Sequence, residues 1–216
     1  MKIDFSKLDL KAIKKIALDT IIDEKEVVIS TIDEDGNPTS RIIDIMFQEE
    51  DALYFLTCNV KPFYFELLKS EKIAITVMTN DFLQVRIKGN CKKVEDTILK
   101  KIYEKNPSFG DLFPEEGKVN NMSVFKIYKG KGELFDLNGD FVKMQRARFD
   151  FGEETVRSAG CIISDACINC GKCAKECPFG AITKKEHYEI NSTYCDECGI
   201  CYAVCPVNAI YIPSGM

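Results

Sequence analysis

Eight of the eleven cysteines in this 216-residue chain follow one spacing, C-x₂-C-x₂-C-x₃-C-P, which occurs twice. The second copy begins 28 residues after the first. The first copy contains Cys167, Cys170, Cys173 and Cys177, and the second contains Cys195, Cys198, Cys201 and Cys205. Cysteine thiolates at this spacing hold [4Fe-4S] clusters. The spacing therefore predicts two such clusters and a role in electron transfer.

Zinc is the alternative ligand, because C-x₂-C pairs also form structural zinc sites. A zinc site seldom needs a third cysteine at the same spacing together with a Cys-Pro pair, and this chain has that combination twice. Iron–sulfur ligation is favoured on this ground. Of the remaining cysteines, Cys58 and Cys91 are interpreted as packing residues, and Cys161 as a buried or spare thiol rather than a ligand.

The two cysteine motifs belong to a longer internal repeat. Residues 167–182 can be laid over residues 195–210, and eight of the sixteen aligned positions are identical. The repeat resembles the two-cluster bacterial ferredoxins, in which each motif lends its fourth cysteine to the cluster of the other motif. That resemblance implies one cluster held by Cys167, Cys170, Cys173 and Cys205, and another held by Cys195, Cys198, Cys201 and Cys177.

Short apolar runs separated by turn residues precede the cysteine repeat. Their periodicity predicts helices over residues 9–22, 62–70 and 95–103, and strands over 27–32, 41–47, 52–57, 73–78, 82–89, 124–128 and 132–137. Many short strands with few helices favour a closed antiparallel barrel, because closure removes exposed strand edges.

The pattern divides the chain into three parts. A mainly β domain is expected over residues 1–140, a connector over 141–160, and a small α+β cysteine module over 161–216. Such a small module has little apolar core, so bound clusters would supply part of its stability.

The composition excludes several classes of function. The chain has 29 basic and 34 acidic residues, and its net charge of −5 without a basic block argues against nucleic-acid or membrane partners. Neither a signal peptide nor an apolar run of membrane-spanning length is recognisable, so we expect a cytoplasmic protein. The single histidine, His187, lies between the cysteine motifs and is interpreted as a surface residue. No glycine-rich nucleotide-binding motif is present.

Several segments of residues 10–137 occur in a recognisable order. They are VIST at 28–31, DGNP at 35–38, SRII at 40–43, YFLTCNVKP at 54–62 and QVRIKG at 84–89. Together they resemble the pyridoxamine 5′-phosphate oxidase-like family of FMN-binding split barrels. The resemblance implies a split β-barrel fold, and a homodimer with FMN at the subunit interface.

The resemblance also implies a set of flavin contacts. Arg41, Ile42, Ile43 and Asp44 on one strand and Thr57 on another would border the flavin, Lys61 would reach the phosphate, and Gln84 would contact the polar edge of the ring. An FMN phosphate is dianionic and needs Lys, Arg or amide donors. This chain departs from the family in having no tryptophan and a shorter spacing between Thr57 and Lys61 than some members.

Each of these residues also has an ordinary interpretation. Arg41 and Lys61 could be surface charges. Thr57 and Gln84 could form hydrogen bonds with backbone groups or with solvent at strand positions. Beyond the barrel, Arg146 and Arg148 are expected to pair with nearby acidic residues rather than to bind a phosphate.

The two resemblances together predict a flavin- and iron–sulfur-dependent oxidoreductase. It would pass electrons between the ferredoxin-type module and FMN, and reduce a small organic acceptor, with an external redox partner supplying or taking up electrons. Oxygen attacks exposed clusters, so an anaerobic setting is expected. The alternatives are a non-enzymatic electron carrier or redox sensor with FMN as a relay, and a barrel that binds haem or F420. Haem is disfavoured because the barrel has no histidine.

Overall fold

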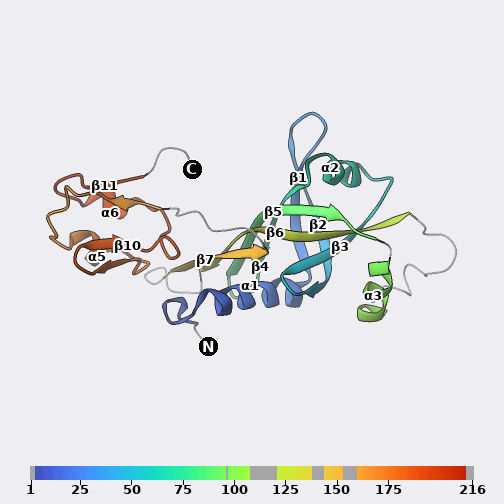
Figure 1. Ribbon diagram of the computed structural model, residues 1–216, viewed down its shortest axis with the longest axis horizontal. Coiled ribbons are helices and arrows are strands. Elements are labelled where there is room, and N and C mark those ends of the chain that lie inside the picture. The colour runs from blue at the N-terminus through green and yellow to red at the C-terminus, as the bar shows by residue number, and fades with distance from the viewer. Residues whose placement is uncertain (1–2, 96, 108–120, 138–143, 153–159, 213–216) are drawn as a thin grey trace.

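The computed structural model describes residues 3–95, 97–107, 121–137, 144–152 and 160–212. The first part of the chain folds into an antiparallel β-barrel (Figure 1). Its strands are β1 (Glu26–Ile32), β2 (Pro38–Glu49), β3 (Ala52–Cys58), β4 (Lys72–Met78), β5 (Leu83–Lys93) and β6 (Met122–Asp136). The strand order is β3-β2-β1-β4-β5-β6, and β3 also pairs with β6, which closes the ring. The expected antiparallel barrel is therefore confirmed.

Alternating apolar residues build the interior of the barrel. Val27 and Ile29 of β1 and Val85 and Ile87 of β5 are buried, whereas their sequence neighbours point outward and are partly or fully exposed. This period of two places these side chains in the main core of the barrel, whereas alternate residues of β3, such as Tyr54 and Leu56, pack in a second cluster with Ile102 of α3 (Thr97–Lys105). None of the helices in the described residues is long and apolar enough to cross a membrane.

Four short helical segments cover the barrel and its ends. They are the 3₁₀ helix η1 (Phe5–Lys7) and the α-helices α1 (Leu10–Glu24), α2 (Pro62–Ser70) and α3 (Thr97–Lys105). The side chain of Asp9 accepts a hydrogen bond from the N–H of Ala12 and caps α1. Helix α2 begins at a proline, as expected, and ends where Glu71 takes a left-handed conformation with φ of 53°. It buries Phe63, Glu66 and Leu67.

Strand β2 pairs with two neighbours in turn. Residues 38–44 pair with β1, and residues 45–49 pair with β3 after a register shift between Ile45 and Phe47. The N–H of Ile45 donates to the carbonyl of Lys25 at 2.9 Å. Because backbone groups alternate in direction along an antiparallel ladder, those of Ile42 and Asp44 point away from β1. Among the described residues, no strand pairs with residues 38–44 of β2 on that side, so the barrel is split there.

Strand β6 is one continuous strand, whereas two strands were expected over 124–128 and 132–137; that prediction is wrong. The gap between the two expected strands contains Gly130. In the structure Gly130 lies directly opposite Gly89 of β5, and a Cβ on either residue would collide with the opposite backbone. The glycine therefore permits a close approach of two strands rather than ending one.

Strand β7 (Gln145–Gly152) pairs with the second half of β6 and extends the sheet. It falls within residues 141–160, which were expected to be a connector, although its buried residues Ala147, Phe149 and Phe151 alternate with less buried ones. The expected connector therefore contains a strand. Residues 141–143 and 153–159 of that range lie outside the described residues.

The C-terminal region is a small α+β unit beside β7 (Figure 1). It contains β8 (Ile162–Ile163), α5 (Lys172–Glu176), β9 (Ile182–Lys184), β10 (Tyr188–Ile190), α6 (Ile200–Ala203) and β11 (Ile210–Tyr211). Strand β8 pairs with β11, and β9 pairs with β10. Its small core mixes aliphatic residues with cysteines, among them Cys173, Cys201, Ile182 and Ile210.

Candidate functional site

Two small cavities lie within the C-terminal region. Cysteines line both of them. The first cavity is lined by Cys167, Cys170, Cys173 and Cys205, and the second cavity by Cys177, Cys195, Cys198 and Cys201. In each, three cysteines come from one motif and the fourth from the other, which is the grouping that the ferredoxin resemblance implies. Cluster ligation by these cysteines stays a prediction.

The arrangement of the donors fits a multi-atom cluster. A [4Fe-4S] cube needs four sulfur donors around a space, whereas a single zinc ion needs four donors that converge on one point. Among the residues described, no three His, Cys, Asp or Glu side chains are grouped so as to hold a single metal ion. The cysteines of each set line a space instead.

The backbone of the two motifs repeats as closely as their sequence. Gly171 and Gly199 begin α5 and α6 with φ values of 75° and 77°. This left-handed conformation favours glycine at both positions. Ahead of them, the N–H groups of Asn169 and Glu197 each donate to the Sγ two residues earlier, at 3.4 Å. Hydrogen bonds to sulfur stabilise thiolate charge and help to set the potential of a bound cluster.

Burial affects several thiols in these cavities. It raises the pKa of Cys201 to about 12 and also raises the pKa of Cys173. Such thiols keep their protons unless a positive group such as cluster iron stabilises the thiolate. Cys161, which was expected to be a buried spare thiol, lines the second cavity and is 4% exposed.

Most of the predicted flavin contacts lie where β2 and β3 separate. The last paired residues there are Ile45 and Phe55, and both strands continue beyond this point without pairing with each other. The outward backbone groups of Ile42 and Asp44 lie on one side of the split. Thr57, which pairs with β6 and is buried, lies on the other side, and the exposed Lys61 follows at the start of α2. Ile43, between the two outward residues, faces inward and packs against the barrel core.

Arg41 is already engaged within the barrel. Its Nη2 lies 2.8 Å from Oε2 of the buried Glu66 and 2.7 Å from the hydroxyl of Thr39, and its Nη1 donates to Thr31. The guanidinium also lies 4.4 Å from the centre of the Phe63 ring. These contacts tie α2 to β1 and β2, and they engage the guanidinium of a residue that was expected to border the flavin.

Gln84 lies apart from the other predicted flavin contacts. It pairs with Met78 of β4 and with Phe135 of β6, and it points outward because Val85 is buried. Strands β1 and β4 separate it from β2. Three inter-strand spacings amount to roughly 14 Å. A single chain therefore does not bring Gln84 beside Lys61 and the open edge of β2.

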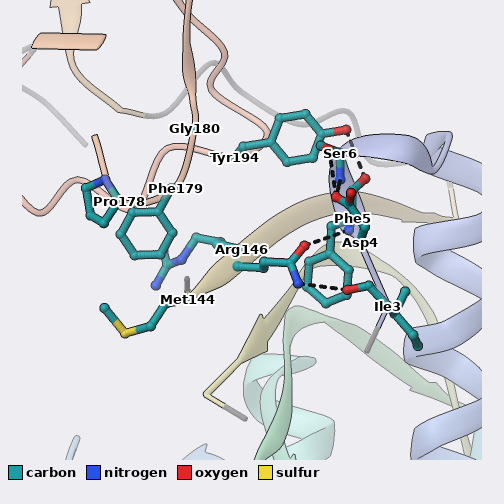
Figure 2. Close-up of a pocket in the computed structure, with 11 residues that line it drawn as sticks. Ile3, Asp4, Phe5, Ser6, Met144, Arg146, Pro178, Phe179, Gly180 and Tyr194 are labelled. Atoms are coloured by element: carbon teal, nitrogen blue, oxygen red, sulfur yellow. Dashed lines mark hydrogen bonds between the residues drawn. The ribbon is translucent and has the colours of Figure 1, made fainter. Parts of the chain in front are cut away.

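The barrel and the cysteine module meet at β7. Arg146 and Arg148 form ion pairs with Asp196 and Glu197 of the module, at 2.8 and 3.4 Å. The expected pairing with acids is therefore confirmed. The partners stand some 50 residues away, and no local sequence pattern could have identified them. A cleft opens at the same junction, and Arg146 lies in it with Phe179 (Figure 2).

Two family models match the sequence. The model described as "Pyridoxamine 5′-phosphate oxidase" matches residues 14–127, and the model described as "4Fe-4S dicluster domain" matches residues 160–212. The second match spans all eight cysteines of the repeat and both cavities.

Solved structures with a similar fold cover the barrel. A NimC/NimA family protein from Clostridium acetobutylicum has a TM-score of 0.54 and 19% identity, over 66% of this chain and 94% of that one. PhzG from Burkholderia lata, solved with tetrahydrophenazine-1-carboxylic acid, has a TM-score of 0.53 and 12% identity, over 68% and 90%. At such identities the likeness concerns the fold alone. No curated protein matches the sequence significantly.

Proposed function

Because the chain belongs to the pyridoxamine 5′-phosphate oxidase family and carries a 4Fe-4S dicluster domain, we propose that it is an FMN-dependent oxidoreductase. It passes electrons between two [4Fe-4S] clusters and FMN, and reduces a small organic acceptor. One observation carries this proposal above the others: a module with two four-cysteine cavities is fixed directly to a split barrel with an open strand edge. FMN exchanges electrons singly or in pairs, whereas a cluster passes them one at a time. The two cofactors together therefore link one-electron transfer to two-electron transfer.

The flavin site that we propose lies at the split between β2 and β3. The outward N–H and C=O groups of Ile42 and Asp44 are suited to hydrogen-bond the polar edge of a flavin ring. Lys61 supplies positive charge for the phosphate, because its ammonium is exposed at the start of α2. Thr57 borders the same opening. Arg41 pairs with Glu66 of α2 and so holds this helix in place. Because Lys61 stands at the start of α2, the same ion pair positions Lys61 for the phosphate.

A second copy of the chain is the partner that we propose for the outer face of the barrel. Ile42 and Val28 are cross-strand partners on this face, and they are 67% and 40% exposed. Met78 of β4, the strand next to β1, is 50% exposed. A two-fold partner would cover these apolar side chains and would enclose the open edge of β2, where the flavin site is proposed.

The composition of the anaerobically purified protein tests this proposal. Two [4Fe-4S] clusters correspond to about eight irons and eight sulfides per chain, and we expect one FMN per chain beside them. The absorption spectrum should show both chromophores. A chain that contains zinc in place of iron, or that binds no flavin under any reducing or oxidising condition, would contradict the proposal.

Turnover distinguishes an enzyme from a carrier. Photoreduced protein is mixed anaerobically with a panel of small acceptors, such as quinones, free flavins and nitroaromatic compounds, and reoxidation of the flavin is followed. We expect rapid reoxidation by at least one small acceptor. If only other redox proteins reoxidise the flavin, the protein is an electron carrier.

A further inference from the structure

The cysteine module contacts the barrel through one of its two cysteine cavities. Arg148 of β7 makes the central contact, because its Nη1 donates to the backbone carbonyls of Ser192 and Cys195, both at 2.6 Å. The backbone N–H of Arg148 also donates to the carbonyl of Thr193 at 3.1 Å. The side chain is only 11% exposed. One arginine therefore binds the loop that leads into Cys195, a residue that lines the second cavity.

A chain of ion pairs reinforces this contact. Arg86 of β5 pairs with Glu133 of β6 at 2.7 Å, and Glu133 pairs with Arg146 of β7 at 3.1 Å. Arg146 then pairs with Asp196, the residue after Cys195, at 2.8 Å. The side chains of Arg146 and Asp196 are 12% and 20% exposed. Removal of one partner from an ion pair that is withdrawn from solvent is strongly destabilising, because it leaves the other charge uncompensated.

Two aromatic residues of the module, Phe179 and Tyr194, also lie at the junction (Figure 2). The ring of Phe179, two residues after Cys177, lies 6.3 Å from the ring of Phe135. Phe135 is the cross-strand partner of Gln84. The hydroxyl of Tyr194, next to Cys195, donates to the carbonyl of Phe5 at 3.4 Å. The barrel therefore touches the residues that flank Cys177 and Cys195, and both of these cysteines line the second cavity.

We propose that Arg146 and Arg148 are positioning residues that fix the loop of Cys195 to the barrel and make the second cavity the inner of the two redox sites. The first cavity, lined by Cys167, Cys170, Cys173 and Cys205, is then the outer site, which faces an external redox partner. The inner site lies on the side of the barrel where Phe135 and Gln84 form a cross-strand pair. This inference rests on the proposed function, since it assigns an order to the two clusters.

The charge and the hydrogen bonds of Arg148 affect the two sites unequally. A buried guanidinium that donates to the carbonyl of a ligand cysteine stabilises the added negative charge of a reduced cluster. Its removal should lower the reduction potential of the cluster in the second cavity and leave that of the first unchanged.

Variants that keep only one cluster allow the reduction potentials of the two clusters to be measured separately. Cys170 and Cys198 are the second cysteines of their motifs, and both are exposed. Cys170→Ala removes a predicted ligand of the first cavity, and Cys198→Ala removes the equivalent ligand of the second cavity. Cys161→Ala is added to the latter because Cys161 lines the same cavity and could replace the lost ligand. Arg148→Gln is introduced into each background, and the potential of the remaining cluster is measured by EPR-monitored titration. We expect a shift to lower potential in the Cys170→Ala background only. Equal shifts in both backgrounds, or none in either, would overturn the proposal.

Hydrogen–deuterium exchange provides a readout that does not depend on cluster loading. Arg148→Gln should raise amide exchange in residues 191–197 and leave residues 167–177 unchanged. Arg148→Lys should also raise it, because one ammonium lacks the planar fork that binds two carbonyls. Wild-type exchange in both variants would show that the contact does not position the loop. Lys88→Gln is the control, because Lys88 is an exposed basic residue of β5 that belongs to none of the ion pairs named above.

The failure of this inference can be told apart from the failure of the proposed function. A protein without iron or flavin fails the composition test, whereas a loaded protein with unaltered potentials and exchange contradicts the cluster order alone.

Discussion

At the scale of single residues, two basic side chains that were both candidates for flavin binding, Arg41 and Lys61, have different environments in the structure. Arg41 stands above an aromatic ring and is bound to the buried carboxylate of Glu66, so its charge is neutralised inside the barrel. Lys61 is exposed at the start of α2, a short distance along the chain from the end of β3. The environment of each side chain, and not its residue type, therefore decides which one is free to meet an anion.

Replacing Lys61 with alanine should weaken FMN binding. A charge-assisted contact to a phosphate contributes about 1.5–3 kcal/mol, which corresponds to a loss of roughly 10- to 150-fold in affinity. Titration of the apo-flavoprotein with FMN, followed by flavin fluorescence, measures the change. Lys69→Ala is the matched control, because Lys69 is an exposed lysine at the other end of the same helix. Equal dissociation constants for wild type and Lys61→Ala would contradict the assignment.

Cys91 should make the stability of the barrel sensitive to alkaline pH. Burial raises the pKa of this thiol to about 12, and the side chain is fully buried in the core. The raised value means that the folded protein keeps the proton while the unfolded chain releases it. The contribution of Cys91 to stability is therefore complete below about pH 9 and declines by about 1.4 kcal/mol per pH unit as the pH rises toward 12.

Anaerobic urea unfolding between pH 7.5 and 10.5 tests this dependence on pH. Cys91→Ala should lower the stability at neutral pH, because it leaves a cavity, but it should also flatten the alkaline decline. Parallel pH curves for the two proteins would show that Cys91 does not titrate in this way.

At the scale of elements, the two cysteine loops are built alike, and each contributes one cysteine to the cavity of the other. Left-handed residues at Gly171 and Gly199 turn each loop, and α5 and α6 follow them directly. After each helix the chain crosses over, so that Cys177 and Cys205 line the cavity of the other motif. The repeat is therefore one folding unit, because neither cavity can be completed by its own motif.

Cys205→Ala should damage the cluster of the first motif rather than that of its own motif. The reduced variant is compared by EPR with the Cys170→Ala single-cluster protein and with the Cys198→Ala/Cys161→Ala protein. Its surviving cluster should match the potential and spectrum of Cys170→Ala. Cys177→Ala should give the converse result. A variant that loses the cluster of its own motif would show that the ligands do not cross between the motifs.

At the scale of the whole molecule, a redox module and a flavin-type barrel are joined by buried charge rather than by a large apolar interface. The connection runs from β5 across β6 and β7 into the loop of Cys195. The opposite part of the outer face, around Ile42 and Val28, is apolar and exposed. The barrel thus presents one polar junction to the module and one apolar face that we assign to a second copy of the chain.

Ile42→Lys should convert the proposed homodimer into a monomer and reduce its FMN content. A lysine in the centre of an apolar interface leaves an unpaired charge without water. Light scattering after size-exclusion chromatography measures the mass, and the released flavin is quantified in the same samples. Ile168→Lys is the control, because Ile168 is 60% exposed on the cysteine module. A wild-type chain that already has monomer mass would contradict the dimer.

Local patterns predicted a large part of this protein. The alternation of apolar residues located the barrel strands, and Pro62 marked the start of α2. The spacing of the cysteines predicted the redox module, and the family model that matches residues 160–212 agrees with it. These features depend on residues a few positions apart, whose side chains share a face or a loop wherever the chain places them.

Contacts between distant segments could be decided only by the tertiary structure. Gly130 appears in the sequence as a strand break, but it permits continuity because Gly89 lies opposite. Arg41 meets Glu66 and Arg148 meets Cys195 across 25 and 47 residues, and Gln84 lies three strands away from β2. The sequence by itself thus determined which chemistry the chain contains. Only the fold decided which cysteine cavity touches the barrel, because that depends on the registry of strands and the packing of a docked module, neither of which has a local signal.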